Sequence, residues 1–232
     1  CSDIREVNKK ISSSKEFKDW SSLPLKKRCY YIDQLRKIVL ANQNKVRSLL
    51  KEETGKKDFD AFLEIFSLIE HLKEISKIAR KSLRPSRRSS GIMKNKKAMV
   101  FYEPLGVAGI ISPWNYPLIL TMSPIVEAIL AGNTVVLKPS EHTPLTTHLL
   151  KKIWDETTES PNLFQPVYGD GKIGSALVKS DQTDVICFTG STIIGRKIAE
   201  TCATLFKPVI LELVGKDPMI ILKDADIDRS IE

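Results

Sequence analysis

The sequence contains few cysteines and histidines, and it has no long hydrophobic run. Its four cysteines show no Cys-x-x-Cys spacing, which argues against a disulfide framework and for reduced thiols: Cys1, Cys29, Cys187 and Cys202. Of the three histidines, two are six residues apart and one is isolated, so we expect no metal site. No apolar run approaches the roughly 18 residues of a membrane span, and no signal segment is present. We therefore expect a cytoplasmic protein with no membrane partner.

The net charge of +8 is local rather than spread along the chain. Residues 80 to 97 carry eight basic side chains and no acidic one, and these eight equal the excess of the whole chain. No aromatic residue is interleaved with them, as stacking on single-stranded nucleic acid would require. We interpret the segment as a solvated connector and expect no nucleic-acid partner, with a polyanion-binding patch as the alternative.

A β-α-β pattern occupies residues 105 to 141. The apolar run Gly106 to Ile111 predicts a strand buried on both faces, followed by a turn at Ser112 to Pro117 and a helix over Leu118 to Ala131. A second buried strand over Thr134 to Leu137 then leads into Lys138-Pro139-Ser140-Glu141. In an open parallel sheet, ligands bind at such strand ends.

Helices are expected before this unit, and strands alternate with helices after it. We predict one helix from Leu25 to Glu53 and a second in which Phe59, Phe62 and Phe66 belong to the core. Further strands or short apolar runs are Ala98 to Glu103, Asn162 to Tyr168, Asp184 to Phe188, Pro208 to Leu213 and Pro218 to Leu222. The pattern predicts an α/β fold with a doubly wound, Rossmann-like parallel sheet and an amino-terminal helical region.

Two glycine-rich loops compete as phosphate-binding sites. Gly169-x-Gly171-x-x-Gly174 matches the dinucleotide fingerprint, but the acidic residue expected about 20 positions later is absent. The second loop runs from Gly190 to Gly195 and offers hydroxyls and backbone amides at the start of a helix, where the helix dipole favours a phosphate. From the residues alone, either loop could equally be a plain tight turn.

Five motifs stand in the order and approximate spacing of the aldehyde dehydrogenase superfamily, which the chain resembles from about Leu25 to its end. They are Pro113-Trp114-Asn115-Tyr116-Pro117, Gly132-Asn133, Lys138-Pro139-Ser140-Glu141, Phe188-Thr189-Gly190-Ser191-Thr192 and Glu212-Leu213-Val214-Gly215-Lys216. The resemblance implies a helical region over residues 1–92, the start of an oligomerisation strand over 93–104 and an NAD-binding Rossmann-like domain over 105–232. It also implies a homo-oligomer.

The resemblance implies a role for each matching residue in binding NAD. Lys138 and Glu141 would hold the adenosine ribose hydroxyls, and because that carboxylate would repel a 2′-phosphate we predict NAD rather than NADP. Ser191 and Trp114 would lie near the pyrophosphate and Ile194 against the adenine, which favours the second glycine loop. The full cofactor-binding set is Ile111, Trp114, Lys138, Ser140, Glu141, Gly171, Gly190, Ser191, Thr192, Ile194 and Gly195.

For catalysis, the family attacks an aldehyde with a cysteine thiolate, reduces NAD and hydrolyses the thioester. Asn115 would donate its amide to the developing oxyanion, and Glu212 would activate the deacylating water. The structural alternatives are that Asn115 bonds its own turn and that Glu212 is a strand-end charge.

The chain departs from the family pattern in three ways. The family nucleophile falls beyond Glu232, and none of the four cysteines replaces it. Val214 stands where the family usually has a glycine, which could restrict Glu212. Pro124 replaces a common lysine, a feature of the branch that acts on medium-chain, fatty or aromatic aldehydes.

We therefore expect the cofactor-binding portion of an NAD-dependent aldehyde dehydrogenase, cut off before its nucleophile and inactive in this form. The alternative is a non-enzymatic nucleotide-binding or interaction module. An aldehyde substrate is expected only in the full-length enzyme.

Overall fold

The computed structural model describes residues 2–15, 18–158, 160–215 and 217–231. A five-stranded sheet lies at its centre, with the strands in the order β5-β4-β3-β6-β7 and every neighbouring pair parallel. The strands are β3 (Val107–Ile111), β4 (Thr134–Lys138), β5 (Phe164–Pro166), β6 (Val185–Gly190) and β7 (Val209–Leu213). The chain first adds strands on one side of β3 and then on the other, so the predicted doubly wound sheet is confirmed.

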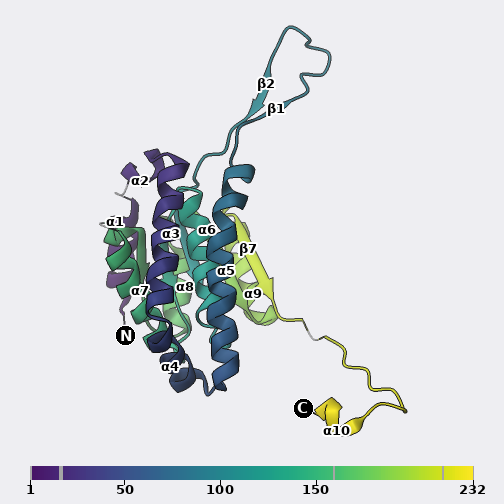
Figure 1. The fold of residues 1–232 in the computed structure, drawn as a ribbon. Coiled ribbons are helices and arrows are strands. Elements are labelled where there is room, and N and C mark those ends of the chain that lie inside the picture. The colour runs from purple at the N-terminus through teal and green to yellow at the C-terminus, as the bar shows by residue number, and fades with distance from the viewer. Residues whose placement is uncertain (1, 16–17, 159, 216, 232) are drawn as a thin grey trace.

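Two layers of helices cover the sheet (Figure 1). On one face lie α3 (Leu25–Ala41), α4 (Gln43–Thr54), α5 (Asp58–Ser82), α6 (Ile119–Leu130) and α7 (Pro144–Thr157). On the other lie α1 (Ile4–Lys15), α8 (Gly171–Lys179) and α9 (Thr192–Thr204). Alternate residues of one strand enter different cores: Ala108 and Ile110 face the first layer, and Val107 faces the second. The sheet is buried on both sides, as expected for parallel strands.

The predicted helix from Leu25 to Glu53 is wrong in one respect, because it is two helices that meet at Asn42. The Asn42 side-chain amide donates to the carbonyl oxygen of Ile38 at 2.9 Å, a local bond that competes with helix continuation. The apolar stripe continues past the break, with Val46 and Leu50 buried.

The prediction that Phe59, Phe62 and Phe66 belong to the core is also wrong. Their exposed fractions are 66%, 42% and 53%, and their rings stack in sequence along the outside of α5. The helix carries a second apolar stripe that packs inward instead: Ala61, Ile65, Leu68, Leu72, Ile75 and Ala79. Helical spacing identifies both stripes but does not say which one faces the sheet.

The basic connector contains a projecting hairpin. Strands β1 (Ser86–Arg88) and β2 (Ala98–Val100) pair antiparallel and extend away from the body (Figure 1). The predicted strand from Ala98 is therefore shorter than expected, and the basic segment is not simply an irregular connector. The hairpin spans the predicted boundary between residues 92 and 93, and the domain limits remain a prediction.

Three short helices complete the described elements: α2 (Lys18–Ser22), the 3-10 helix η1 (Pro161–Leu163), which takes the start of a predicted strand, and α10 (Ile227–Ile231). The apolar run at 218–222 stays outside the sheet, and Ile220 is 79% exposed. This carboxyl-terminal stretch extends from β7 away from the body (Figure 1). Within the described ranges, no helix is both long and apolar enough to cross a membrane.

Candidate functional site

The carboxyl ends of the parallel strands surround a cavity of about 990 Å³. Its lining includes the residues where β3, β4, β6 and β7 end: Ile111, Lys138, Gly190 and Leu213. The cavity lies beside β3 and β6, between which the strand order reverses, and this is where an open α/β sheet binds ligands. Its volume is at the upper end of the range for cofactor pockets.

Most of the residues predicted from the sequence line this one cavity. They are Ile111, Trp114, Asn115, Lys138, Ser140, Glu141, Gly171, Gly190, Ser191, Ile194 and Glu212. Two predicted residues, Thr192 and Gly195, do not line it. The turn with the asparagine, the lysine and glutamate after β4, and Glu212 therefore lie at the same edge of one sheet.

The sequence analysis did not identify the side chains that α8 and α9 contribute to the lining. Ser175 and Val178 on α8, and Lys197, Ile198 and Thr201 on α9, recur at helical spacing from residues that were predicted. That spacing, taken from Gly171 and Ile194, is the signal that could have found them.

Lys138 and Glu141 form an ion pair at the wall of the cavity. The Lys138 ammonium is buried and donates to Glu141 Oε2 at 2.8 Å, while the Glu141 side chain is 52% exposed. The hydrogen bond from Lys138 lowers the pKa of the Glu141 carboxyl. An ammonium has three donors, and among described residues only Glu141 accepts from this one, so donors remain for a ligand oxygen.

The turn between β3 and α6 places Asn115 at the mouth of the cavity. Trp114 and Tyr116 on either side are 54% and 48% exposed. The Trp114 and His142 rings meet edge-on, with their centroids 6.4 Å apart. No residue within the described ranges hydrogen-bonds the Asn115 side chain, so the alternative in which it bonds its own turn finds no support. Its amide is free to donate to a ligand.

Helix α9 begins at the cavity. Ser191 is its N-cap, and the Oγ atom accepts from the Ile194 backbone N–H at 3.4 Å. The end of an α-helix with free N–H groups favours an anion. Ile194 is 45% exposed and adds an apolar surface. Gly195 acts differently, because a Cβ there would lie 2.4 Å from Leu213 Cδ2, so this glycine lets α9 approach β7 closely.

Glu212 is exposed on β7 and lines the cavity. Val214, two residues later, also lines the cavity and is 70% exposed. The described part of the chain offers the Glu212 carboxylate no hydrogen-bond or ion-pair partner. The carboxylate is thus available to accept a proton.

The described cysteines are poorly placed to act as nucleophiles. Cys29 and Cys202 are buried. Burial, with the carboxylates of Glu127 and Glu212, raises the pKa of Cys187 to about 11, so its thiol is protonated at neutral pH. Cys1 lies outside the described residues. Among described residues, no group of three or more His, Cys, Asp or Glu side chains could hold a metal ion.

The sequence matches the aldehyde dehydrogenase family over residues 2–232. It is 34% identical over 237 residues to the mitochondrial succinate-semialdehyde dehydrogenase of Arabidopsis thaliana. The matched region covers 100% of this chain and 44% of that protein. The structure resembles an NAD-dependent aldehyde dehydrogenase from Sinorhizobium meliloti with a TM-score of 0.89 and 32% identity, covering 98% of this chain and 46% of that one. An NADP dependent enzyme from E. coli gives a TM-score of 0.90 and 28% identity, covering 98% and 47%.

The chain thus spans less than half the length of these relatives. The family match nevertheless extends over nearly every residue, and the fold and the strand-end cavity agree with it. The chain belongs to the aldehyde dehydrogenase family.

Proposed function

We propose that this chain forms the NAD-binding part of an aldehyde dehydrogenase, which oxidises an aldehyde to a carboxylic acid while NAD is reduced. The observation that supports this most is the shared cavity, which brings together Lys138, Glu141, the start of α9, Asn115 and Glu212. Bound NAD supplies the acceptor for the electron pair that the aldehyde carbon loses.

The chemistry of the cavity wall fits a dinucleotide. Lys138 and Glu141 offer a donor and an acceptor to the two hydroxyls of the adenosine ribose. Ser191 and the free N–H groups of α9 suit the pyrophosphate, and the exposed Ile194 side chain suits the adenine. Trp114, Ser140, Gly171, Gly190 and Ile111 complete the lining, whereas Thr192 and Gly195 would act through the shape of α9.

The preference for NAD over NADP rests on the charge of Glu141. A carboxylate at the ribose hydroxyls repels a 2′-phosphate, and the lowered pKa of Glu141 keeps it charged at neutral pH. The named relatives include an NAD-dependent and an NADP dependent enzyme, so the family does not decide the cofactor and the preference is inferred from Glu141.

Two residues would serve the chemical step. The Asn115 amide would donate to the negative charge that develops on the aldehyde oxygen, a contribution worth about 10²–10³ in kcat. Glu212, as an unpaired carboxylate, would accept a proton from the water that hydrolyses the thioester. Since no described cysteine is poised as a thiolate, we expect residues 1–232 alone to bind NAD without oxidising aldehydes. A homo-oligomer and a cytoplasmic location remain predictions.

The proposal is tested by titration calorimetry with the Glu141→Ala variant. Loss of charged hydrogen bonds to the ribose should weaken NAD binding by roughly 10- to 100-fold, because such bonds are each worth about 1.5–3 kcal/mol. NADP binding should change far less, so that the discrimination between the two cofactors narrows.

The matched control is Glu156→Ala, which removes an exposed carboxylate from α7 away from the cavity. It should bind NAD as the unaltered chain does. Equal NAD affinity in the Glu141→Ala variant and the unaltered chain would refute the ribose assignment, and aldehyde-dependent NADH formation by residues 1–232 would refute the expected inactivity.

A further inference from the structure

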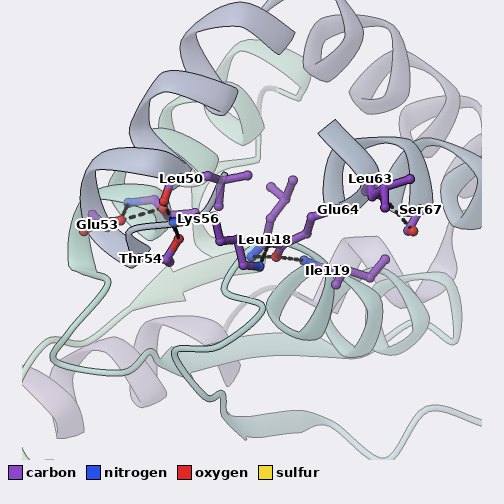
Figure 2. A network of polar contacts seen from close by, with 10 residues as sticks. Leu50, Glu53, Thr54, Lys56, Leu63, Glu64, Ser67, Leu118 and Ile119 are labelled. Atoms are coloured by element: carbon purple, nitrogen blue, oxygen red, sulfur yellow. Dashed lines mark hydrogen bonds and ion pairs between the residues drawn. The ribbon is translucent and has the colours of Figure 1, made fainter. Parts of the chain in front are cut away.

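A buried carboxylate on α5 contacts the start of α6, more than fifty residues later in the chain. Glu64 is 2% exposed, and its Oε1 atom accepts the backbone N–H groups of Leu118 at 2.8 Å and Ile119 at 3.2 Å (Figure 2). Helix α6 begins at Ile119, and its N-cap residue, Leu118, has no polar side chain to accept these groups. A carboxylate at this position satisfies orphan donors and complements the helix dipole. Glu64 therefore supplies the cap that the local sequence lacks.

The second oxygen of the same carboxylate contacts Lys56. Lys56 Nζ and Glu64 Oε2 form an ion pair and hydrogen bond, and both side chains are largely buried, with the Lys56 side chain 13% exposed (Figure 2). The Lys56 ammonium also lies 3.8 Å from the centre of the Tyr116 ring, a cation-π contact. Lys56 thus contacts Tyr116, which directly follows Asn115, and Glu64 binds the backbone N–H of Leu118, two residues after Tyr116.

Two other contacts restrain the residues next to Asn115: the Trp114 ring meets the His142 ring, and the Tyr116 carbonyl accepts the Leu120 backbone N–H at 3.1 Å. At the β3 end, Ser112 donates its backbone N–H to the Lys138 carbonyl at 3.2 Å and accepts from Thr121 Oγ1 at 2.8 Å. Between Ser112 and α6, the turn presents exposed side chains to the cavity, and Asn115 has no partner within the described ranges. The position of the Asn115 amide therefore depends on how the helical end of the turn is held.

We propose that Glu64 and Lys56 are positioning residues that hold the Asn115 amide in place at the cavity. They act through the start of α6 and through the Tyr116 ring, without touching the ligand. The proposal deepens the proposed function, on which it rests for the role of Asn115, but the placement of the Asn115 turn can be tested independently of any activity.

The chain offers a matched control in Glu53. Its carboxylate is partly exposed and caps the next helix, with Oε1 accepting from the backbone N–H of Leu145 at 2.6 Å and Oε2 from that of Thr146 at 2.7 Å. Helix α7 follows Glu141 rather than Asn115. Glu53→Gln and Glu64→Gln therefore each remove the charge of a carboxylate that caps a helix, at two different turns of the site.

The test records the side-chain amide resonances of Asn115 in the ¹⁵N-labelled chain, assigned by their absence in Asn115→Asp. It also measures acrylamide quenching of Trp114, which is exposed while Trp20 and Trp154 are buried. We expect Glu64→Gln and Lys56→Met to shift or broaden the Asn115 resonances and to increase the quenching. Lys56→Arg should retain the resonances, because arginine can pair with the carboxylate and lie over the ring. Glu53→Gln should leave them unchanged.

Each variant is first checked for cooperative thermal unfolding. If Glu64→Gln does not fold, Lys56→Met alone tests the proposal, because that variant keeps the Glu64 carboxylate at the start of α6. Unchanged Asn115 resonances in folded Glu64→Gln and Lys56→Met would overturn the proposal. Equal changes in Glu53→Gln would also overturn it, by showing a general loss of stability. The Asn115 resonances and the Trp114 quenching are recorded without NAD, so a failure of the Glu141→Ala test would concern the proposed function alone.

Discussion

Cys187 lies in the interior strand β6, paired with Ile110 of β3 and Ile210 of β7. Burial is the main cause that raises the pKa of its thiol to about 11, and the negative charges of Glu127 and Glu212 add to it. Each effect penalises the thiolate, so this cysteine resists both alkylation and oxidation in the folded chain. The strand that carries it leads directly to the cavity at Gly190.

This shift predicts a loss of stability at alkaline pH. The folded-state pKa is above the ordinary thiol value of 9.0, so the unfolded chain loses this proton first as pH rises. The stabilisation from Cys187 is therefore complete below pH 9 and declines as pH rises toward 11. Denaturant unfolding should show a smaller decrease in the free energy of unfolding over this interval for Cys187→Ala than for the unaltered chain. Identical decreases would exclude this contribution.

Close packing of α9 on β7 determines the position of the strand that carries Glu212. The contact is possible because residue 195 has no side chain: a Cβ there would lie 2.4 Å from Leu213 Cδ2. Leu213 also packs against the cluster that contains Ile198 and Cys202. The helix and the strand end are thereby held together at the cavity.

Gly195→Ala should therefore be less stable than its matched control by about 1 kcal/mol, the lower end of the cost of overpacking, because the atom that must shift is a terminal methyl of the Leu213 side chain. The matched control is Gly171→Ala at the start of α8, where a Cβ would meet nothing within 4 Å. Its free energy of unfolding should stay within about 0.5 kcal/mol of the unaltered chain. Equal stability of the two variants in denaturant unfolding would contradict the packing argument.

Helices and strands followed the sequence pattern closely, and the errors have identifiable causes. Helix α6 lies within the predicted range Leu118 to Ala131, and the break at Asn42 reflects a side-chain hydrogen bond that periodicity does not detect. Helix α5 has two apolar stripes at helical spacing, one that contains Phe62 and one that contains Ile65. Only packing against α3 and α6 decides which stripe is buried.

At the scale of the whole molecule, the hairpin β1–β2 is separate from the core. No described residue between 80 and 106 is buried, and the basic side chains of the hairpin are exposed. The hairpin projects from the body (Figure 1). An exposed two-stranded hairpin is marginal on its own. Its edges offer unpaired backbone groups, which a second copy of the chain could pair with.

Replacing residues 87–99 with a short glycine-serine linker should leave Tm within about 2 °C, because surface changes rarely exceed about 0.5 kcal/mol. The paired ends, Ser86 and Val100, are adjacent, so a short linker can join them. We expect light scattering to show loss of self-association. The control with Arg87 and Arg88 changed to glutamine keeps the hairpin and should still associate. Self-association that persists without the hairpin would exclude it as the contact.

The sequence by itself determined the order of strands and helices, the family, and the motifs that meet at the strand ends. These features are local, because apolar periodicity, glycine turns and the Lys138 to Glu141 spacing are all visible within a few residues. Asn115 and Glu212 line one cavity because each follows or ends a strand of the same parallel sheet, and parallel strands end at one edge.

Only the tertiary structure decided what joins residues that are distant in the chain. Glu64 reads as an ordinary surface charge on an amphipathic helix, yet it is buried and caps α6. Glu53, which is partly exposed, caps α7. A helix cap supplied from another element leaves no spacing signal, because the donor groups are backbone N–H groups that every sequence has. Long-range packing therefore places the two turns of the site.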